Sequence, residues 1–309
     1  NIALNFAYSF VLSLLAGNSN IVRISSTKFK QNIIFFRILN NLFKKKIFKR
    51  IQDNSLFVQY DYDDEVTRFF SMRADCRVIW GSDKTINKIK KIETNPICKE
   101  IIFPDRYSIS ILNTNNLKKS SNSVYQNTSK KLYADSLMFD QNACSSPHLV
   151  IWVGKRNKAV QEKFWKYLDN HIRKEKLFES TEKKMFDKYT KICELSAARK
   201  EIKNSKKIGF INLSELKCIP DDIDKFRIGS GYFFEFHVKN LKNFNIKFGK
   251  KVQTLSYYGF KKSELKNFLF SSKSLGIDRI VPVGRGLEFD QVWDGYDLIR
   301  SLSKIVNIH

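Results

Sequence analysis

The sequence predicts an α/β protein, and three observations lead to this prediction. Short apolar runs such as residues 21–24 and 149–154 have the length and composition of buried parallel strands. Longer segments between such runs carry apolar residues at helical spacing. Strands and helices then alternate along much of the 309 residues, which is the order expected of a parallel sheet covered by helices. A chain of this length can bury a substantial core and is long enough for two domains.

The first hundred residues predict four helices and three strands. Residues 2–15 have helical spacing and end at Gly17 and Asn18, which suit a helix C-terminus. Ser25, Ser26 and Thr27 are candidate N-caps for the next helix. In order, we expect a helix at 2–15, a strand at 21–24, a helix at 29–43, a strand at 55–60, a helix from 63, a strand at 76–80 and a helix after Asp83.

The remaining residues predict a second group of elements. Residues 100–112 form an apolar crossing segment, whereas the Asn, Ser and Lys content of residues 113–129 is typical of a surface loop. Residues 132–140 are apolar enough for a buried helix or strand. In order, we then expect a core strand at 149–154, charged helices over 157–207, strands at 208–211, 231–238 and 252–258, a helix at 262–271, a strand at 279–283 and a closing helix at 298–306.

The net charge of +24 suggests a nucleic-acid partner at first sight, because Lys and Arg outnumber Asp and Glu by 55 to 31. However, the basic residues are mostly Lys and are spread over the whole chain together with many Asn, Ile and Phe residues, which is typical of a biased composition. The densest group, at residues 44–50, continues an amphipathic helix and indicates a solvated face. We therefore expect no nucleic acid, although a positive field favours anionic ligands such as phosphorylated cofactors.

The cysteines and the N-terminal residues predict a cytoplasmic protein without an integral membrane span. Five scattered cysteines without CxxC or nearby His argue against disulfides and against a metal site, and favour a reducing compartment. Residues 2–16 are apolar, but they are too few to span a bilayer and no basic region precedes them. Because the chain starts at Asn1 in the middle of a pattern, we expect that an N-terminal portion is missing.

Two short motifs are candidates for chemistry. Cys144 lies on a turn of small residues that enters the strand at 149–154, a position from which a thiolate can act as a nucleophile. The alternative is that Cys144 is an inert packing group, as most buried cysteines are. Gly81 and Ser82 follow a strand and precede a helix, where backbone N–H groups suit a phosphate, but the same residues also fit an ordinary βα turn.

Four segments, spread over the whole chain, carry a resemblance to a known family: residues 16–25, 75–83, 143–147, and 276–284 with 293–296. In this order they resemble the LuxC-like acyl-CoA reductases, which reduce fatty acyl groups and form a branch of the aldehyde dehydrogenase superfamily. The resemblance implies an aldehyde-dehydrogenase-like α/β fold with a Rossmann-type cofactor domain and an α/β catalytic domain. It places an NADP-binding domain at 1–105, a catalytic domain with the nucleophilic cysteine at 106–283, and a C-terminal segment at 284–309 that closes against the cofactor domain.

The resemblance also implies roles for single residues. Cys144 matches the nucleophile of the superfamily, and Asn1 matches the Asn whose amide holds the oxyanion, although Asn1 is alternatively only a chain end. Arg23, Ser25 and Ser26 fall where the superfamily contacts the adenosine ribose, and Ser26 stands at the place of an acidic residue. Arg and Ser favour a 2′-phosphate, so the resemblance implies NADPH. Gly81 and Ser82 match the turn at the pyrophosphate.

The sequence also departs from the superfamily. Residues 101–108 offer no counterpart of its general-base Glu, which fits a reductase that must keep water from the acyl-enzyme. His148 and His237 are interpreted as packing residues and Glu235 as a structural residue. The resemblance, together with these departures, implies an oxidoreductase that uses NADPH to reduce fatty acyl-CoA, or an acyl-protein thioester, to a fatty aldehyde through an S-acyl-cysteine.

Two other functions remain open at this stage. One is a short-chain acylating aldehyde dehydrogenase that uses NAD, and the more remote one is a basic nucleic-acid-binding protein. The resemblance implies a fatty acyl-CoA substrate, an acyl-protein synthetase as a candidate partner and a homo-oligomer. A role in luminescence or in another aldehyde pathway fits equally well.

Overall fold

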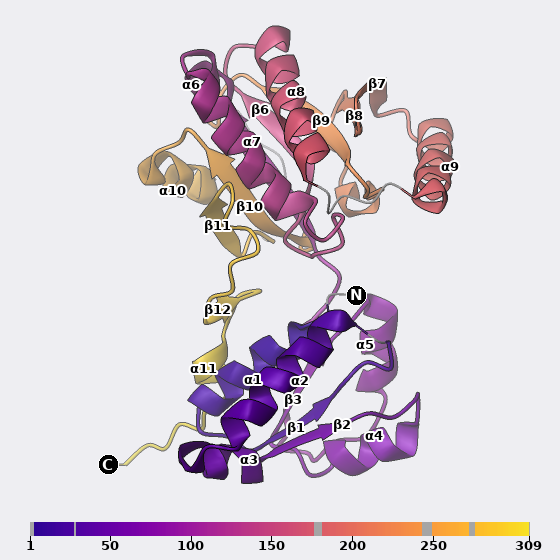
Figure 1. Ribbon diagram of the computed structural model, residues 1–309. Helices are drawn as coiled ribbons and strands as arrows, with labels where there is room; N and C mark the ends of the chain where they lie inside the picture. The colour runs from indigo at the N-terminus through magenta and orange to yellow at the C-terminus, as the bar shows by residue number, and fades with distance from the viewer. Residues whose placement is uncertain (1–2, 28, 176–180, 243–248, 272–275, 309) are drawn as a thin grey trace. The chain divides into compact units, whose positions relative to one another are not determined.

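The computed structural model describes residues 3–27, 29–175, 181–242, 249–271 and 276–308 (Figure 1). The chain forms two compact units, and each is described by itself. Unit 1 consists of Asn1–Asp105 together with Phe289–His309, and unit 2 consists of Arg106–Glu288. The predicted roles of the two parts, cofactor binding and catalysis, stay predictions. No helix of the described residues is both long and apolar enough to cross a bilayer.

Unit 1 is built from helices, two short parallel strand pairs and the antiparallel pair of β12 with β13. Strand β1 pairs in parallel with β2, and β3 pairs in parallel with β4. The elements are α1 (Asn5–Leu15), β1 (Asn20–Arg23), α2 (Lys30–Phe43), the 3-10 helix η1 (Lys46–Phe48), α3 (Lys49–Asp53), β2 (Ser55–Val58), α4 (Asp64–Ser71), β3 (Cys76–Trp80), α5 (Asp83–Lys90), β4 (Lys99–Phe103), β12 (Val292–Trp293), β13 (Tyr296–Asp297) and α11 (Leu298–Ser301).

The core of unit 1 joins residues from both ends of the chain. Phe103 on β4 is buried and stacks on Trp80, with ring centroids 4.0 Å apart. Trp293 and Leu298 belong to the same buried cluster, although they lie almost two hundred residues later in the sequence. The C-terminal residues therefore contribute core side chains to unit 1.

Unit 2 contains a seven-stranded sheet in the order β11-β10-β5-β6-β9-β8-β7. All its neighbouring strands are parallel except β7 and β8, which form an antiparallel hairpin. The elements are β5 (Tyr107–Asn113), α6 (Thr114–Lys118), α7 (Asn122–Ser136), β6 (Pro147–Val153), α8 (Lys158–Lys174), α9 (Glu182–Ala198), β7 (Ile202–Ile208), β8 (Ile211–Leu216), the 3-10 helix η2 (Ile223–Lys225), β9 (Tyr232–Val238), β10 (Val252–Tyr258), α10 (Lys262–Ser271) and β11 (Arg279–Pro282).

Helices cover both faces of this sheet (Figure 1). Helices α7 and α8 pack on one face and share a buried cluster with Val150 and Trp152 of β6. On the other face, α10 contributes Leu265 and Phe268 to a cluster with Leu149 and Ile151. All seven residues of β6 are buried, because a central parallel strand covered on both faces has no solvent side.

Most predicted elements are present, and four expectations were wrong. Residues 202–207, expected to be helical, belong to strand β7 instead. Residues 113–129 are not a surface loop but contain α6 and the first half of α7. The Asn113 side chain caps the start of α6 by accepting from the Asn116 N–H at 3.1 Å. Residues 208–211 are not a strand, because Gly209 turns the chain between β7 and β8 with φ of +55°. The closing helix α11 ends at Ser301 rather than at residue 306.

Candidate active site

Cys144 lies in a tight turn between α7 and β6. The Ser146 N–H donates to the Ala143 carbonyl at 2.9 Å, and this bond closes the turn around Cys144. Ala143 and Ser145 are buried on either side, whereas Cys144 itself is half-buried. The turn therefore holds its thiol at the boundary between core and surface, directly before a fully buried strand.

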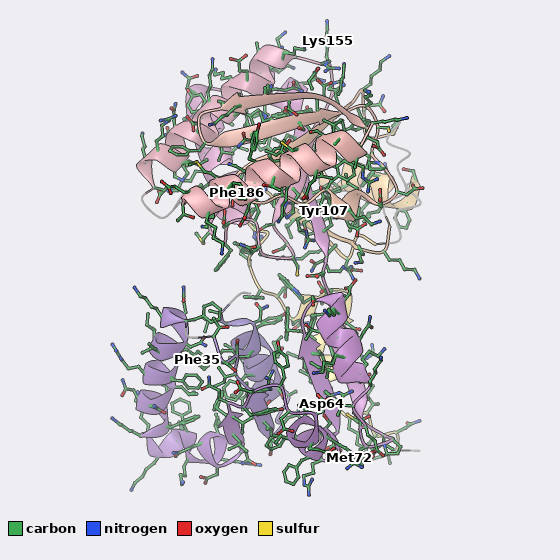
Figure 2. The ribbon with its side chains drawn as sticks, turned by 90° about the vertical axis from the view of Figure 1, so that its right-hand side faces the viewer. Phe35, Asp64, Met72, Tyr107, Lys155 and Phe186 are labelled. Carbon is green, nitrogen blue, oxygen red and sulfur yellow. The ribbon has the colours of Figure 1, made fainter. Side chains whose placement is uncertain are left out.

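The turn lies at the side of the sheet where the N-terminal ends of the parallel strands meet. Figure 2 shows Tyr107, the first residue of β5, at this edge of unit 2, and Lys155, which follows β6, at the opposite edge. Since Cys144 precedes Pro147, the first residue of β6, it lies on the Tyr107 side of the sheet. The candidate nucleophile thus lies near the N-terminal ends of the neighbouring strands β5 and β6.

Gln141 fixes the turn to β9, a role that no local pattern around this residue indicates. Its side chain is 2% exposed. The Gln141 Nε2 donates to the carbonyls of Pro147 at 3.2 Å and Tyr232 at 2.9 Å, while Oε1 accepts from the Gly231 N–H at 2.9 Å. The residue has a positive φ of 57°, a conformation that costs free energy in most residues, and these three bonds offset that cost.

Two serine hydroxyl groups form further hydrogen bonds that fix the turn. The Ser108 Oγ on β5 donates to the Cys144 carbonyl at 2.6 Å, and the Ser146 Oγ donates to the Asp135 carbonyl on α7 at 2.8 Å. The backbone of the turn is thus tied to β5, α7 and β9 at once. Such fixed geometry is what a nucleophile needs in order to meet a substrate carbon in a defined direction.

His148 is a packing residue of this edge and carries no charge at neutral pH. It is buried, and its ring stacks on Tyr107 with centroids 5.5 Å apart. Burial, together with the nearby Arg227 guanidinium, lowers the pKa of His148 to about 3. A neutral imidazole supplies no positive charge that would stabilise a thiolate at Cys144.

The predicted ribose-binding residues lie at the end of β1 in unit 1. Arg23, Ser25 and Ser26 are all exposed. The Arg23 Nη2 donates to the Tyr60 carbonyl at 3.0 Å, and the guanidinium lies over the Tyr60 ring at 4.7 Å from its centroid. Because no carboxylate forms an ion pair with Arg23 among the described residues, its positive charge is presented to solvent.

Asp61 is a residue that the sequence analysis missed. Its carboxylate accepts from the Ser26 hydroxyl at 3.2 Å. The end of β1 therefore does have an acidic neighbour, although the sequence predicted none there. This carboxylate comes from the segment after β2 rather than from β1 itself. Only the parallel pairing of β1 with β2, which aligns Arg23 with Val58, brings these two segments together.

Gly81 and Ser82 form the turn between β3 and α5. The Ser82 Oγ accepts from the Thr85 N–H at 3.3 Å and so caps the helix. A Cβ at Gly81 would lie 3.0 Å from the Thr85 side chain, so packing within the turn already accounts for this glycine. The turn presents a helix N-terminus, as a phosphate site requires, although the first turn also carries Asp83.

Of the other candidate residues, Asn1 lies outside the described residues. Glu235 is 6% exposed, and its Oε1 accepts from the indole N–H groups of Trp152 and Trp165, both at 2.7 Å. Burial lowers the pKa of His237, which lies beside Glu235 in a cavity of about 250 Å³. The described residues contain no group of three His, Cys, Asp or Glu side chains that could hold a metal ion.

The predicted residues thus form two groups. Cys144 belongs to unit 2, and the residues expected at the cofactor belong to unit 1. Within unit 1, Tyr62 connects the two segments that are predicted to bind the cofactor, because its ring faces both the Arg23 guanidinium at 5.6 Å and Lys88 of α5 at 5.3 Å. The Arg23 strand end and helix α5 are therefore neighbours.

Solved structures with the same fold are aldehyde dehydrogenases. An NAD-dependent benzaldehyde dehydrogenase from Corynebacterium glutamicum matches 94% of this chain with a TM-score of 0.57 and 10% identity, and the match covers 61% of that protein. A lactaldehyde dehydrogenase matches 89% of this chain with a TM-score of 0.58 and 10% identity, and the match covers 58% of that protein. The chain thus spans about three fifths of the length of these proteins.

These matches confirm the predicted α/β fold of the aldehyde dehydrogenase type, and at such low identity they show the fold alone. No curated protein is similar enough in sequence to match the chain. The family model of the LuxC acyl-CoA reductases matches residues 1–210 of the 309, which include both the β1 and α5 segments and the Cys144 turn. The chain therefore belongs to the LuxC acyl-CoA reductase family.

Proposed function

We propose that the protein reduces fatty acyl-CoA, or an acyl-protein thioester, to a fatty aldehyde through an S-acyl intermediate on Cys144. The observation that carries this proposal is the Cys144 turn: a half-buried thiol, held by three elements, in a chain of the LuxC acyl-CoA reductase family. Unit 2 would then be the catalytic domain and unit 1 the cofactor domain, closed by the C-terminal residues.

In the first step, the Cys144 thiolate attacks the thioester carbon and the CoA thiolate leaves, so that one thioester replaces another. The family resemblance assigns the Asn1 amide and the Cys144 N–H to the developing oxyanion. Reduction converts the acyl group to a hemithioacetal, whose collapse releases the aldehyde and regenerates the Cys144 thiolate. His148 takes no part as a cationic acid at neutral pH, because its pKa is lowered to about 3.

A bound nicotinamide dinucleotide would supply the hydride for this reduction. The residues of unit 1 fit such an anionic ligand in part. The exposed Arg23 guanidinium and the N-terminus of α5 attract phosphate, whereas the Asp61 carboxylate repels a 2′-phosphate and suits a free 2′-hydroxyl. We favour NADPH because the positive charge of Arg23 attracts the 2′-phosphate that distinguishes NADPH from NADH.

Two substitutions test the choice of cofactor. We expect Arg23→Ala to raise the KM for NADPH about tenfold or more, since it removes a charge-assisted contact to phosphate, with little change for NADH. Asp61→Asn should shift the preference further toward NADPH. If NADH is the better substrate of the unchanged protein and Arg23→Ala alters neither KM, the choice of NADPH is wrong.

A labelling experiment tests the nucleophile. Incubation with a radioactive fatty acyl-CoA in the absence of reductant should leave one acyl group on Cys144, sensitive to hydroxylamine. Cys144→Ala should abolish both this label and aldehyde formation. Cys193→Ala and Cys218→Ala are matched controls, because both thiols are exposed and should be dispensable. Aldehyde formation by Cys144→Ala would refute the assignment.

The same assay separates the rival within this class. A short-chain acylating aldehyde dehydrogenase would prefer acetyl-CoA or propionyl-CoA with NADH as the reductant, whereas the proposed reductase prefers long acyl chains with NADPH. We extend the proposal to a cytoplasmic homo-oligomer that can receive acyl groups from an acyl-protein synthetase. Mixing the two proteins and following transfer of the label to Cys144 tests that partner.

A further inference from the structure

Asp135 is a buried carboxylate that the proposed reaction does not use. It lies near the C-terminal end of α7 and is 1% exposed. Its Oδ2 accepts from the Gly284 N–H at 2.6 Å, and its Oδ1 accepts from the Gly286 N–H at 2.8 Å. We call residues 284–288 the return link; this segment follows β11 and ends unit 2. Both carboxylate oxygens of Asp135 thus bind the backbone of the return link.

Arg279 holds the same link from its other side. Its Nη1 donates to the Gly286 carbonyl at 2.8 Å, and its Nη2 donates to the carbonyls of Arg285, at 3.1 Å, and Glu288. Five backbone groups of a five-residue segment are therefore bound by one buried anion and one cation. A Cβ at Gly286 would lie 3.1 Å from the Asp135 carboxyl carbon, and Gly284 has a positive φ of 97°, so the link has little room for other residues.

The backbone of Asp135 also contacts the nucleophile turn. Its carbonyl accepts from the Ser146 Oγ at 2.8 Å, and the N–H of Ser146 closes the turn around Cys144. A single residue of α7 therefore touches the return link through its side chain and the Cys144 turn through its backbone.

We infer that Asp135 is a positioning residue that couples the Cys144 turn to the return link, and that the coupling is strongest while its carboxylate is ionised. An ionised carboxylate can accept from Gly284 and Gly286 at the same time. A protonated one must give up part of its acceptor capacity to its own proton. The role of the turn in catalysis rests on the proposed function, whereas the coupling itself does not.

Burial and the neighbouring charged groups set the pH at which the Asp135 carboxylate becomes protonated. Burial raises the pKa of Asp135 to about 6; the Gly284 and Gly286 N–H groups and then Arg279 act to lower it, while Glu288 acts to raise it. Lys131 on α7 lies against Gly284, and Arg285 in the link pairs with Glu288 at 2.5 Å. The link should therefore be held firmly above about pH 6 and loosen as the pH falls through that value.

Hydrogen exchange of the full chain tests the clamp. Protection of the Gly284 and Gly286 amides, corrected for intrinsic exchange, should fall about tenfold as the pH drops through the pKa of Asp135, which corresponds to the loss of one charge-assisted bond. In Asp135→Asn the protection should be lower and independent of pH, because an amide offers only one acceptor oxygen. Asp221→Asn, an exposed carboxylate of the same unit, should keep the transition.

Alkylation with iodoacetamide tests the coupling. The rate at Cys144, divided by the rate at the exposed Cys218 in the same sample, should change around pH 6 in the unchanged protein and stay constant in Asp135→Asn. A merely structural Asp135 would lower the melting temperature of the variant but would leave the pH response of this ratio in place, and that result would overturn the inference.

Ser146→Ala gives an independent test if Asp135→Asn fails to fold. It leaves the carboxylate intact, so the return link should keep its pH transition while the Cys144 ratio loses its own. A ratio that still responds to pH in Ser146→Ala contradicts the coupling. Failure of the proposed function would appear instead as aldehyde formation by Cys144→Ala, which has no bearing on exchange at the link.

Discussion

At the scale of single residues, the Cys144 turn depends on buried polar side chains whose partners are all in unit 2. Gln141 is the clearest case, since one amide satisfies two carbonyls and one N–H. Without it, three buried backbone groups would each lose one hydrogen bond, which costs free energy in a buried site. The turn is thus stabilised by a residue that need not touch the substrate.

Replacing Gln141 by Ala should therefore lower the free energy of unfolding by roughly 2–4 kcal/mol, because the buried backbone groups lose these hydrogen bonds. Denaturant unfolding at neutral pH measures this change. Asn142→Ala is the matched control, since Asn142 is the exposed neighbour and should change stability by less than about 0.5 kcal/mol. Equal effects of the two substitutions would contradict the role assigned to Gln141.

The lowered pKa of His148 leads us to expect that the protein loses stability in acid. Its pKa is about 3 in the folded protein and 6.5 as the reference value, so the unfolded chain binds an extra proton between these values. The contribution of neutral His148 is complete above pH 6.5 and is lost as the pH falls, by about 2 kcal/mol at pH 5. His148→Phe should remove this part of the acid dependence, measured by urea unfolding at several pH values. An unchanged slope would show that His148 is not the group responsible.

At the scale of elements, Glu235 links β6, β9 and α8 through two indole N–H groups. The seven-stranded sheet therefore has a polar connection inside an otherwise apolar layer. The Glu235 Oε2 also lies 3.7 Å from the Nζ of the exposed Lys206, an ion pair that solvent screens.

Glu235→Leu should destabilise the protein by about 3–5 kcal/mol, because both buried indoles lose their acceptor. Glu235→Gln keeps an acceptor oxygen and should cost roughly 1 kcal/mol, so the pair separates the hydrogen bonds from the charge. Thermal unfolding with tryptophan fluorescence as the signal measures both. If Gln and Leu are equally harmful, the charge rather than the indole contacts holds these elements.

At the scale of the whole molecule, unit 1 is assembled from both ends of the chain. Residues 289–309 contribute Trp293, Leu298 and Leu302 to its core, where they meet Leu12 and Phe103. Each buried side chain of this size contributes about 1.5–3 kcal/mol, so the segment supplies a large part of the few kcal/mol by which a domain is stable.

Truncation after Glu288 should therefore unfold unit 1 and leave unit 2 folded. Hydrogen exchange by mass spectrometry should show fast exchange for peptides of residues 3–105 and unchanged protection for the sheet around β6. Truncation after Ser303 removes only exposed described residues and is the matched control. Full protection of unit 1 after the first truncation would contradict the place given to the C-terminal segment.

Local sequence predicted most elements and made Cys144 a candidate nucleophile, whereas its assignment to that role came from the family resemblance. The periodicity of apolar residues predicted β6, β10 and α10, because burial on one or two faces leaves a direct mark on composition. It failed for α7, whose Asn- and Ser-rich first half looked like a loop. The tertiary structure makes it a helix by burying Tyr125 and Leu132 against the sheet.

The partners of the candidate site were decided only by the tertiary structure. Asp61 meets Ser26 because β1 and β2 are parallel neighbours, and Gln141 meets Tyr232 because β9 lies beside β6. Asp135 reaches Gly284 across almost 150 residues. The order of strands in a sheet sets such contacts, and that order leaves no local pattern in the sequence. Local residue pattern thus determined which segments fold and where the thiol lies, whereas long-range pairing decided which side chains surround it.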